Sequence, residues 1–302
     1  MKIAVTGASG LVGQALLQHW RAAAHSLVAI GRRAAPASGP SVQTVQWDPA
    51  AGVLEAHALG GVEAVVHLAG ESLAAGRWNA ALKERLRTSR VQGTQLIARS
   101  MAALAVRPRV LVCASAIGFY GDRGDEILTE DSAPGSGFLP DTCRLWEAAA
   151  QPARDAGIRV VHVRTGIVLA RAGGALPQML VPFRLGVGGP LGSGRQWMSW
   201  ISLPDLVQIF DRAVQDDTLQ GAVNAVAPLP VTNTVFSRTL AATVHRPAFF
   251  RAPATALRLL LGTEKADALL LSSARVMPSR LQAAGHPFQH PDLDAALRAV
   301  LR

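Results

Sequence analysis

The sequence predicts an α/β fold, in which a doubly wound parallel sheet carries helices on both faces and is followed by a smaller C-terminal lobe. Three observations lead to this prediction. Short apolar runs alternate with segments of helical spacing through the first 165 residues. A glycine cluster lies between the first apolar run and the first helical segment. Beyond residue 165 the alternation gives way to glycine-rich connections and then to a mainly helical end.

The elements of the first part follow from these patterns in chain order. The apolar runs predict strands over 2–6, 27–30, 42–47, 64–68, 109–113 and 159–163. Apolar residues that recur every three or four positions predict helices over 11–24, 79–101 and 140–156. Strands that alternate with helices in this way are typical of parallel strands joined by crossover helices.

The glycine cluster after the first strand has the spacing of a phosphate-binding loop. It reads Gly7-Ala8-Ser9-Gly10-Leu11-Val12-Gly13 and leads directly into the first helix. In a Rossmann fold the first glycine permits a tight turn, the second admits the pyrophosphate, and the third lets helix and strand pack closely. Helix N-terminal amides then face the phosphates. The cluster therefore predicts a dinucleotide site that includes Ser9, Leu11 and Val12 as well as the glycines.

The residues after the second strand predict which dinucleotide is bound. NAD-specific Rossmann domains place an acidic residue there, which accepts hydrogen bonds from the adenosine ribose. This chain has Gly31-Arg32-Arg33 instead, so no carboxylate repels a 2′-phosphate and two guanidinium groups can bind it. The alternative is that these arginines face solvent at a strand end. We expect the cofactor to be NADP(H).

The chain is expected to divide near residue 165. Residues 1–165 form the predicted NADP-binding Rossmann domain, and parts of 195–228 complete its sheet. Residues 166–302 form a mixed substrate lobe, in which 247–302 are mainly helical. Helices are expected there over 253–261, 265–271 and 292–301.

Composition and charge exclude several other functions. Hydrophobic residues make up 49% of the chain and charged residues 17%, which argues for an ordered globular protein. The net charge is +9, but the densest basic run, 85–90, has no interleaved aromatic residues, so nucleic-acid binding is not expected. No apolar run approaches the length of a membrane span. Cys113 and Cys143 have neither disulfide nor zinc spacing, so we expect no metal site and a cytoplasmic location.

Further segments resemble the extended short-chain dehydrogenases/reductases, and more closely their atypical NAD-dependent epimerase/dehydratase-like branch, the epimerase family proteins. The segments that carry the resemblance are 68–72, 76–78, 89–90, 115–122, 146–147, 164–168, 188–194, 200–201 and 261–285. They extend over nearly the whole chain. The resemblance implies that Leu68, Ala69 and Gly70 line the cofactor crevice, together with Arg90 and Val168.

The same resemblance shows where the catalytic pattern breaks. Other members of the superfamily use a Tyr-x-x-x-Lys pair, in which the lysine lowers the tyrosine pKa and holds the ribose. Counting back from Glu147, Leu139 and Cys143 occupy these two positions. At Ala116 this chain lacks the serine or threonine hydroxyl that the superfamily usually places there. The usual proton relay is therefore largely missing.

Two candidates for acid/base chemistry remain, Tyr120 and Ser115. Tyr120 follows the fifth strand, at the edge of the sheet where ligands bind; alternatively, its ring packs against the lobe and its hydroxyl is hydrogen-bonded. Ser115 could contact nicotinamide or substrate, or satisfy local backbone groups. Five acidic residues between 122 and 131 are interpreted as a solvated connection.

Two functions follow from this reading. The first is an NADP(H)-dependent oxidoreductase or nucleotide-sugar epimerase-like enzyme, with an unknown small-molecule substrate held between the lobes. The second is a non-catalytic NADP(H)-binding sensor or interaction protein. The sequence leaves the substrate and the oligomeric state open.

Overall fold

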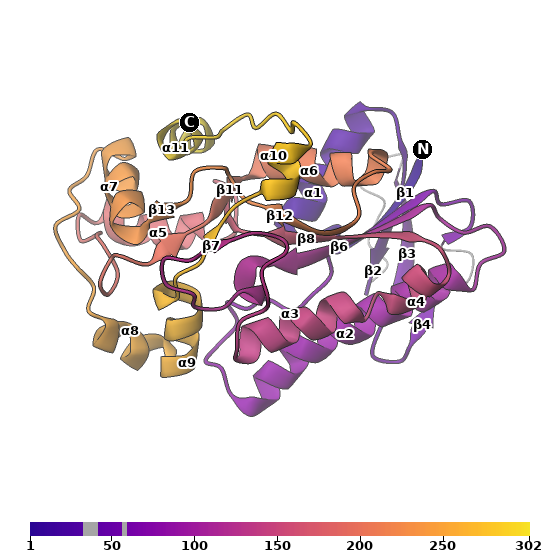
Figure 1. Ribbon diagram of the computed structural model, residues 1–302, viewed down its shortest axis with the longest axis horizontal. Coiled ribbons are helices and arrows are strands. Elements are labelled where there is room, and N and C mark those ends of the chain that lie inside the picture. The colour runs from indigo at the N-terminus through magenta and orange to yellow at the C-terminus, as the bar shows by residue number, and fades with distance from the viewer. Residues whose placement is uncertain (33–41, 56–58) are drawn as a thin grey trace.

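A computed structural model describes residues 1–32, 42–55 and 59–302 (Figure 1). Its main feature is an eight-stranded sheet in the order β12-β8-β6-β5-β1-β2-β3-β4. Its strands are β1 Lys2–Thr6, β2 Ser26–Gly31, β3 Val42–Asp48, β4 Val53–Leu54, β5 Ala64–His67, β6 Val110–Ala116, β8 Arg159–Thr165 and β12 Gly221–Ala225. All neighbours pair in parallel except β3 and β4. The predicted fold class is confirmed.

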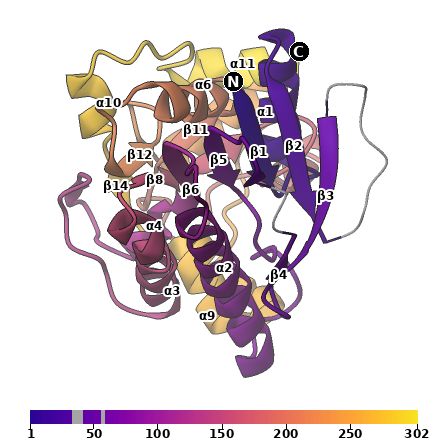
Figure 2. The same cartoon turned by 90° about the vertical axis from the view of Figure 1, so that its right-hand side faces the viewer.

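Helices cover both faces of this sheet (Figure 2). The helices α1 Leu11–Ala22 and α6 Leu203–Gln215 lie on one face, and α2 Ala80–Ala102, α3 Phe138–Ala148 and α4 Gln151–Asp155 on the other. The single helix predicted over 140–156 was wrong, because the chain forms α3 and α4 with a short turn between them. Pro152 lies in the first turn of α4, and a proline inside a continuous helix would remove a hydrogen bond and clash with the preceding turn.

Because the sheet is covered twice, its strands are apolar on both faces. Ile3 and Val5 of β1 pack in one core cluster with Leu16 of α1, whereas Ala4 between them packs in the opposite cluster with Ile97 of α2. All five side chains are fully buried. This is the continuous apolar pattern expected of a central parallel strand.

The remaining elements form the lobe at the end of the molecule away from β2 and β3 (Figure 1). They are β9 Ile167–Leu169, α5 Leu176–Arg184, β10 Trp197–Met198, β11 Trp200–Ser202, β13 Val231–Thr232, α7 Asn233–Thr243, α8 Ala254–Leu261, α9 Thr263–Ala266, a π-helical turn Asp267–Leu271, β14 Arg275–Val276, α10 Ser279–Ala283 and α11 Leu293–Leu301. Between β6 and α3 the chain forms a short 3-10 turn, Ile117–Phe119, and β7 Ile127–Leu128, which pairs with β14.

Three helices lie where the sequence predicted only glycine-rich connections and short apolar stretches. They are α5, α6 and α7, and the first two have proline in their first turn. Their apolar faces pack against the lobe core and, for α6, against the sheet. Within the described residues, no helix combines the length and the apolar character that crossing a bilayer requires.

Candidate cofactor crevice and buried polar network

The topology of the sheet places a crevice between β1 and β5. From β1 the chain continues to β2 and β3 on one side, whereas β5 is followed by β6 and β8 on the other. Neighbouring strands whose connections leave in opposite directions open a crevice at their carboxyl ends, where α/β proteins bind ligands. Thr6 and His67 are paired at these ends. The glycine loop follows β1 there, and Leu68, Ala69 and Gly70 follow β5.

The glycines of the loop are required by close contacts. Gly7 has a φ of +68°, and a Cβ atom on it would lie 2.9 Å from the nitrogen of Ala69. A Cβ atom on Gly13 would lie 2.3 Å from the carbonyl oxygen of Gly7. The loop thus packs against both α1 and the end of β5 without room for side chains at these two positions.

Gly10 differs from its two neighbours because it faces open space. A Cβ atom on Gly10 would meet only the Gly7 carbonyl oxygen, at 3.3 Å, and both Ser9 and Gly10 are exposed. Gly10 is the N-cap of α1, and no side chain caps the helix there. The first N–H groups of a helix have no partner within it. This end of α1 therefore fits a pyrophosphate.

A buried threonine and histidine hold the opposite wall of the crevice. The Thr6 hydroxyl accepts hydrogen bonds from the backbone N–H groups of Leu68, at 3.1 Å, and Ala69, at 3.2 Å. Because these occupy both lone pairs, its proton is donated to Nδ1 of His67, at 2.7 Å. Burial lowers the pKa of His67 to about 4, so the ring is neutral. The pair fixes the chain where it leaves β5.

The other predicted cofactor residues lie around this crevice. Leu11 begins α1, and Cβ atoms on Gly173 and Gly174 of the lobe would lie 3.5 Å and 3.4 Å from its side chain. Val12 and Val168 are partly buried beside the first core cluster. Gly31 ends β2, and the adjacent Arg32 is exposed. Arg33 lies outside the described residues. Each of these cofactor contacts stays a prediction.

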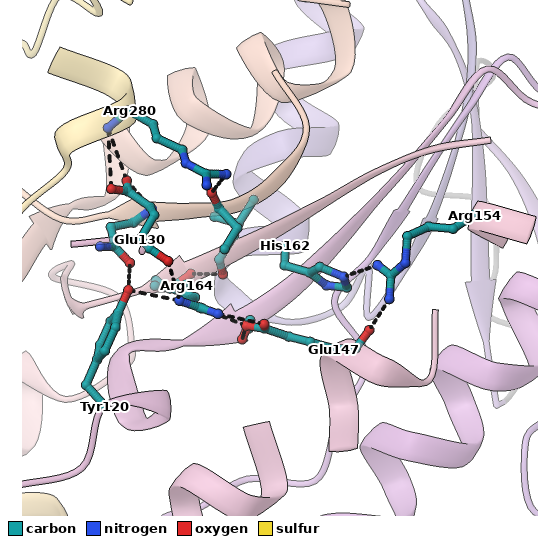
Figure 3. Close-up of polar contacts among 12 residues, drawn as sticks. Tyr120, Glu130, Glu147, Arg154, His162, Arg164 and Arg280 are labelled. Atoms are coloured by element: carbon teal, nitrogen blue, oxygen red, sulfur yellow. Dashed lines mark hydrogen bonds and ion pairs between the residues drawn. The ribbon is translucent and has the colours of Figure 1, made fainter. Parts of the chain in front are cut away.

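Near the carboxyl ends of β6 and β8, five side chains form a buried polar network (Figure 3). The hydroxyl of Ser115, near the end of β6, donates to Oε1 of Glu147 at 2.7 Å. Arg164 of β8 donates from Nε and Nη2 to the two carboxylate oxygens of Glu147, both at 2.8 Å. Nη1 of Arg164 donates to the Tyr120 hydroxyl at 3.0 Å, and that hydroxyl donates to Oδ1 of Asn224 at 2.7 Å.

The network determines the protonation of its members. Burial alone would raise the pKa of Glu147, but the hydrogen bonds and charge of Arg164 outweigh burial and bring this pKa below its ordinary value. Burial raises the pKa of Tyr120, whose side chain is fully buried. At neutral pH the carboxyl group is ionised and the phenol carries its proton. The acid/base roles of Tyr120 and Ser115 remain predictions.

The positions of the missing Tyr-x-x-x-Lys pair are filled by packing. A Cβ atom on Gly118 would lie 3.5 Å from Cβ of Leu139 and 3.9 Å from Sγ of Cys143, so both helix positions face the turn after β6. Burial raises the pKa of Cys143 to about 12. The thiol is therefore neutral and supplies neither a cation nor a proton-transfer group near physiological pH.

The acidic connection is not uniformly solvated. Glu130 is buried and accepts a hydrogen bond from the backbone N–H of Asn224 at 3.0 Å, so the interpretation as a solvated loop was wrong for this residue. Asp125 accepts from the indole of Trp197, and Asp131 pairs with Arg280. The sequence did not identify the roles of Glu130 and Asn224, because 94 residues separate them in the chain.

Comparison with known proteins adds independent findings. A model described as "NAD dependent epimerase/dehydratase family" matches residues 3–225, and one described as "Domain of unknown function (DUF1731)" matches residues 252–300. An epimerase family protein of Mycobacterium bovis is 42% identical over 295 residues, which cover 98% of this chain and 96% of that protein.

Two solved structures are also similar. The crystal structure of human epimerase family protein SDR39U1 with NADPH has 35% identity and a TM-score of 0.89, and 99% of each chain is covered. The nucleoside-diphosphate sugar epimerase from Corynebacterium glutamicum has 37% identity and a TM-score of 0.81; all of this chain is covered, and it spans 58% of that longer one.

Proposed function

Because this chain belongs to the NAD-dependent epimerase/dehydratase family, we propose that it binds NADP(H) between β1 and β5 and oxidises or reduces a small molecule there. The uncapped, exposed start of α1 at Gly10 is the observation that carries this proposal. It offers backbone N–H groups to a pyrophosphate, next to a wall held by Thr6 and His67. The NADPH in the human relative's structure supports the same cofactor.

Each part of the cofactor has residues that suit it. The start of α1 would hold the pyrophosphate, and Arg32 with Arg33 would bind the 2′-phosphate through charge-assisted hydrogen bonds. Leu68, Ala69 and Gly70 would line the side of the crevice toward the nicotinamide. When bound, the nicotinamide supplies a hydride acceptor or donor.

Proton transfer in such a reaction would need residues other than a Tyr-x-x-x-Lys pair. Of the two candidates, Ser115 is the better placed, because its hydroxyl donates to an ionised carboxylate and keeps its lone pairs for another donor. The hydroxyl of Tyr120 already has Arg164 and Asn224 as partners inside the core. We therefore assign proton handling to Ser115 ahead of Tyr120, which would position Arg164.

The charge of the lobe favours an anionic substrate. Residues 166–204 and 218–263 contain no aspartate or glutamate but include seven arginines, three in the first range and four in the second. These ranges supply β9, α5, α7 and α8, the elements that stand beyond the sheet (Figure 1). A surface of one charge raises the local concentration of the opposite charge. We therefore expect the substrate to be a small molecule that carries a phosphate or carboxylate group, rather than nucleic acid or a membrane. We also expect the protein to be located in the cytoplasm.

The second candidate is a non-catalytic NADP(H)-binding sensor. The observation that favours it is the filling of the two catalytic positions by Leu139 and by the buried, neutral Cys143. In this case the cofactor would be bound without turnover, and the oxidised and reduced forms would stabilise the chain to different extents.

One experiment separates these functions. Purified protein is titrated with NADPH by calorimetry and then incubated with anionic carbonyl compounds, alcohols and nucleotide sugars while nicotinamide absorbance is followed; product analysis detects epimerisation without net redox change. Turnover that Ser115→Ala removes supports the enzyme, and tight binding without turnover supports the sensor.

The control for both readouts is Gly10→Val. Its side chain would fill the pyrophosphate space and abolish binding, whereas the contact of a Cβ atom with the protein is only the 3.3 Å approach to Gly7. The variant should therefore keep its fold. Binding of NADPH by a folded Gly10→Val protein would contradict the proposed site.

A further inference from the structure

We propose that Lys265, in the C-terminal unit of residues 252–300, is a positioning residue for the proposed NADP(H) site. Its ammonium group holds the loop 71–78, which continues the crevice wall beyond Gly70, in the shape that a ligand on the nicotinamide side requires. This inference rests on the proposed function. It gives the C-terminal unit a part in ligand binding.

Lys265 is a buried cation whose hydrogen-bond partners belong to the loop. The residue is 7% exposed, and its Nζ atom donates to the carbonyl oxygens of Ala74 at 2.9 Å and Gly76 at 2.6 Å. Among the described residues no carboxylate lies within 4.0 Å of this nitrogen, whereas Nζ of Lys83 lies 2.8 Å from Glu264. A buried ammonium group needs partners that replace water, and here the loop supplies them.

The shape of the loop depends on the cation in turn. The carbonyl oxygens of Ala74 and Gly76 converge on one nitrogen atom, and their partial negative charges repel each other unless a positive charge lies between them. Gly76 has a φ of +42°, in the left-handed region that favours glycine. The N–H of Ala75 donates to the carbonyl oxygen of Ser72 at 3.2 Å, so a tight turn presents both oxygens to Lys265.

This loop is continuous with the wall of the crevice. The wall begins at Leu68, whose N–H is bound by the Thr6 hydroxyl. Gly70 lies against α2, because a Cβ atom on it would be 3.5 Å from Cγ of Arg90. Lys265 holds the chain at the other end of the same stretch. The wall is therefore fixed at both ends, and the C-terminal unit supplies one of the two fixed points.

The segment that follows α9 contacts a second loop, the glycine-rich loop 188–194 of the lobe. In the π-helical turn, the carbonyl oxygen of Leu270 accepts a hydrogen bond from Nε2 of Gln196 at 3.0 Å. A Cβ atom on Gly192 would lie 2.7 Å from Cδ2 of Leu271, so the loop packs directly on this turn. The C-terminal unit thus joins the crevice wall to the lobe and fixes their separation.

The first measurement follows the loop itself. Trypsin cuts after Arg77, which is exposed in the loop, and mass spectrometry compares this cut with the cut after Arg171, which is exposed in the lobe. In Lys265→Met the cut after Arg77 should become about tenfold faster, because cleavage follows the fraction of molecules in which the segment is open. The cut after Arg171 should keep its rate.

The second measurement follows the ligand. NADPH and adenosine 2′,5′-bisphosphate share the adenosine 2′-phosphate, and each is titrated into the full chain by calorimetry. NADPH should bind about tenfold more weakly to Lys265→Met, because apparent affinity falls with the fraction of molecules whose wall is in place. The bisphosphate lacks the nicotinamide half and should bind within about twofold of the unmodified protein. Lys265→Arg keeps a cation with several N–H donors and should recover most of the NADPH affinity.

Lys83→Met is the matched control. Lys83 pairs with Glu264 and so joins α2 to α9, but the two side chains are 30% and 47% exposed. Exposed pairs contribute little, so this variant should change neither the cut after Arg77 nor the NADPH affinity. Thermal unfolding of each variant measures fold stability separately.

The inference is overturned if folded Lys265→Met binds NADPH as the unmodified protein does, or if it loses both probes equally. It is also overturned if Lys265→Arg binds as weakly as Lys265→Met, or if Lys83→Met has the same effects. Failure of the unmodified protein to bind NADPH would instead overturn the proposed function, and the cut after Arg77 would still test the hold of Lys265 on the loop.

Discussion

Glu147 and Arg164 face each other with both carboxylate oxygens and two guanidinium nitrogens engaged, each contact at 2.8 Å. The two side chains are only 13% and 6% exposed, and they join α3 to β8 (Figure 3). A buried pair of this geometry is costly to break, because removing one charge leaves the other buried without its partner.

Glu147→Gln should therefore lower the free energy of unfolding by about 3 kcal/mol or more, measured by urea denaturation at neutral pH. Asp141→Asn is the matched control, because Asp141 pairs with Arg144 at 3.7 Å on the surface of the same helix. Exposed pairs contribute about 1 kcal/mol or less. Similar losses in the two variants would contradict the importance assigned to the buried pair.

Two buried histidines should make the fold sensitive to mild acid. Burial lowers the pKa values of His67 and His162 to about 4. In the unfolded chain each binds a proton below about pH 6.5, so the unfolded state takes up more protons than the folded state. The contribution of the two neutral histidines to the free energy of unfolding is fully present above that pH. It is lost as the pH falls toward 4, by about 1.4 kcal/mol per pH unit for each histidine.

Urea denaturation at about pH 7.5 and about pH 5 measures this loss. In His162→Gln the free energy of unfolding should fall less between the two pH values, because only one of the two buried histidines remains to take up a proton on unfolding. In His245→Asn, where the histidine is exposed, it should stay as in the unmodified protein. A loss that His162→Gln leaves unchanged would assign the acid sensitivity to other groups.

Tyr120→Phe should separate packing from cofactor binding. It leaves Oδ1 of Asn224 without a donor and removes an acceptor from Nη1 of Arg164, which should cost about 1–3 kcal/mol of stability. NADPH affinity should stay within roughly threefold, a change below about 0.7 kcal/mol. If calorimetry on the folded variant shows a far larger loss, Tyr120 belongs to the cofactor site.

The strand-two arginines should set the preference for the phosphorylated cofactor. Arg32 is exposed next to the end of β2, where a 2′-phosphate could reach it. We expect NADPH to bind roughly tenfold to a thousandfold more tightly than NADH at low salt, and less so as salt rises. Replacing Arg32 and Arg33 with alanine should remove most of this preference and change NADH affinity little. Equal affinities of the unmodified protein for the two cofactors would refute the assignment.

The strands of the sheet could be predicted from the sequence where the local residue pattern already reflects how the strand packs in the fold. Each central strand is buried on both faces, so its run of apolar residues is visible without knowing its neighbours. Gly7 and Gly13 could be recognised because the contacts that exclude a side chain there lie within the loop or at the adjacent strand end. These features recur wherever a helix follows a strand around a phosphate.

The helices α5, α6 and α7 were missed because proline and glycine interrupt their surroundings. Even so, α6 carried a usable signal: Ser202 accepts a hydrogen bond from the backbone N–H of Asp205, and serine followed three residues later by an acid marks a helix start. No local pattern could pair Ser115, Glu147 and Arg164, because these residues come from three separate elements. Such networks require the fold before their partners can be identified.

The position of β12 has a consequence for how this chain folds during synthesis. β12 pairs with β8, yet residues 166–220 lie between these two strands in the sequence. At about 5–20 residues per second, a ribosome takes roughly 3–11 s to add that segment. Throughout this interval the outer edge of β8 presents unpaired backbone groups, which can pair with another nascent chain. The order of synthesis thus leaves β8 as an edge strand of the sheet until β12 emerges.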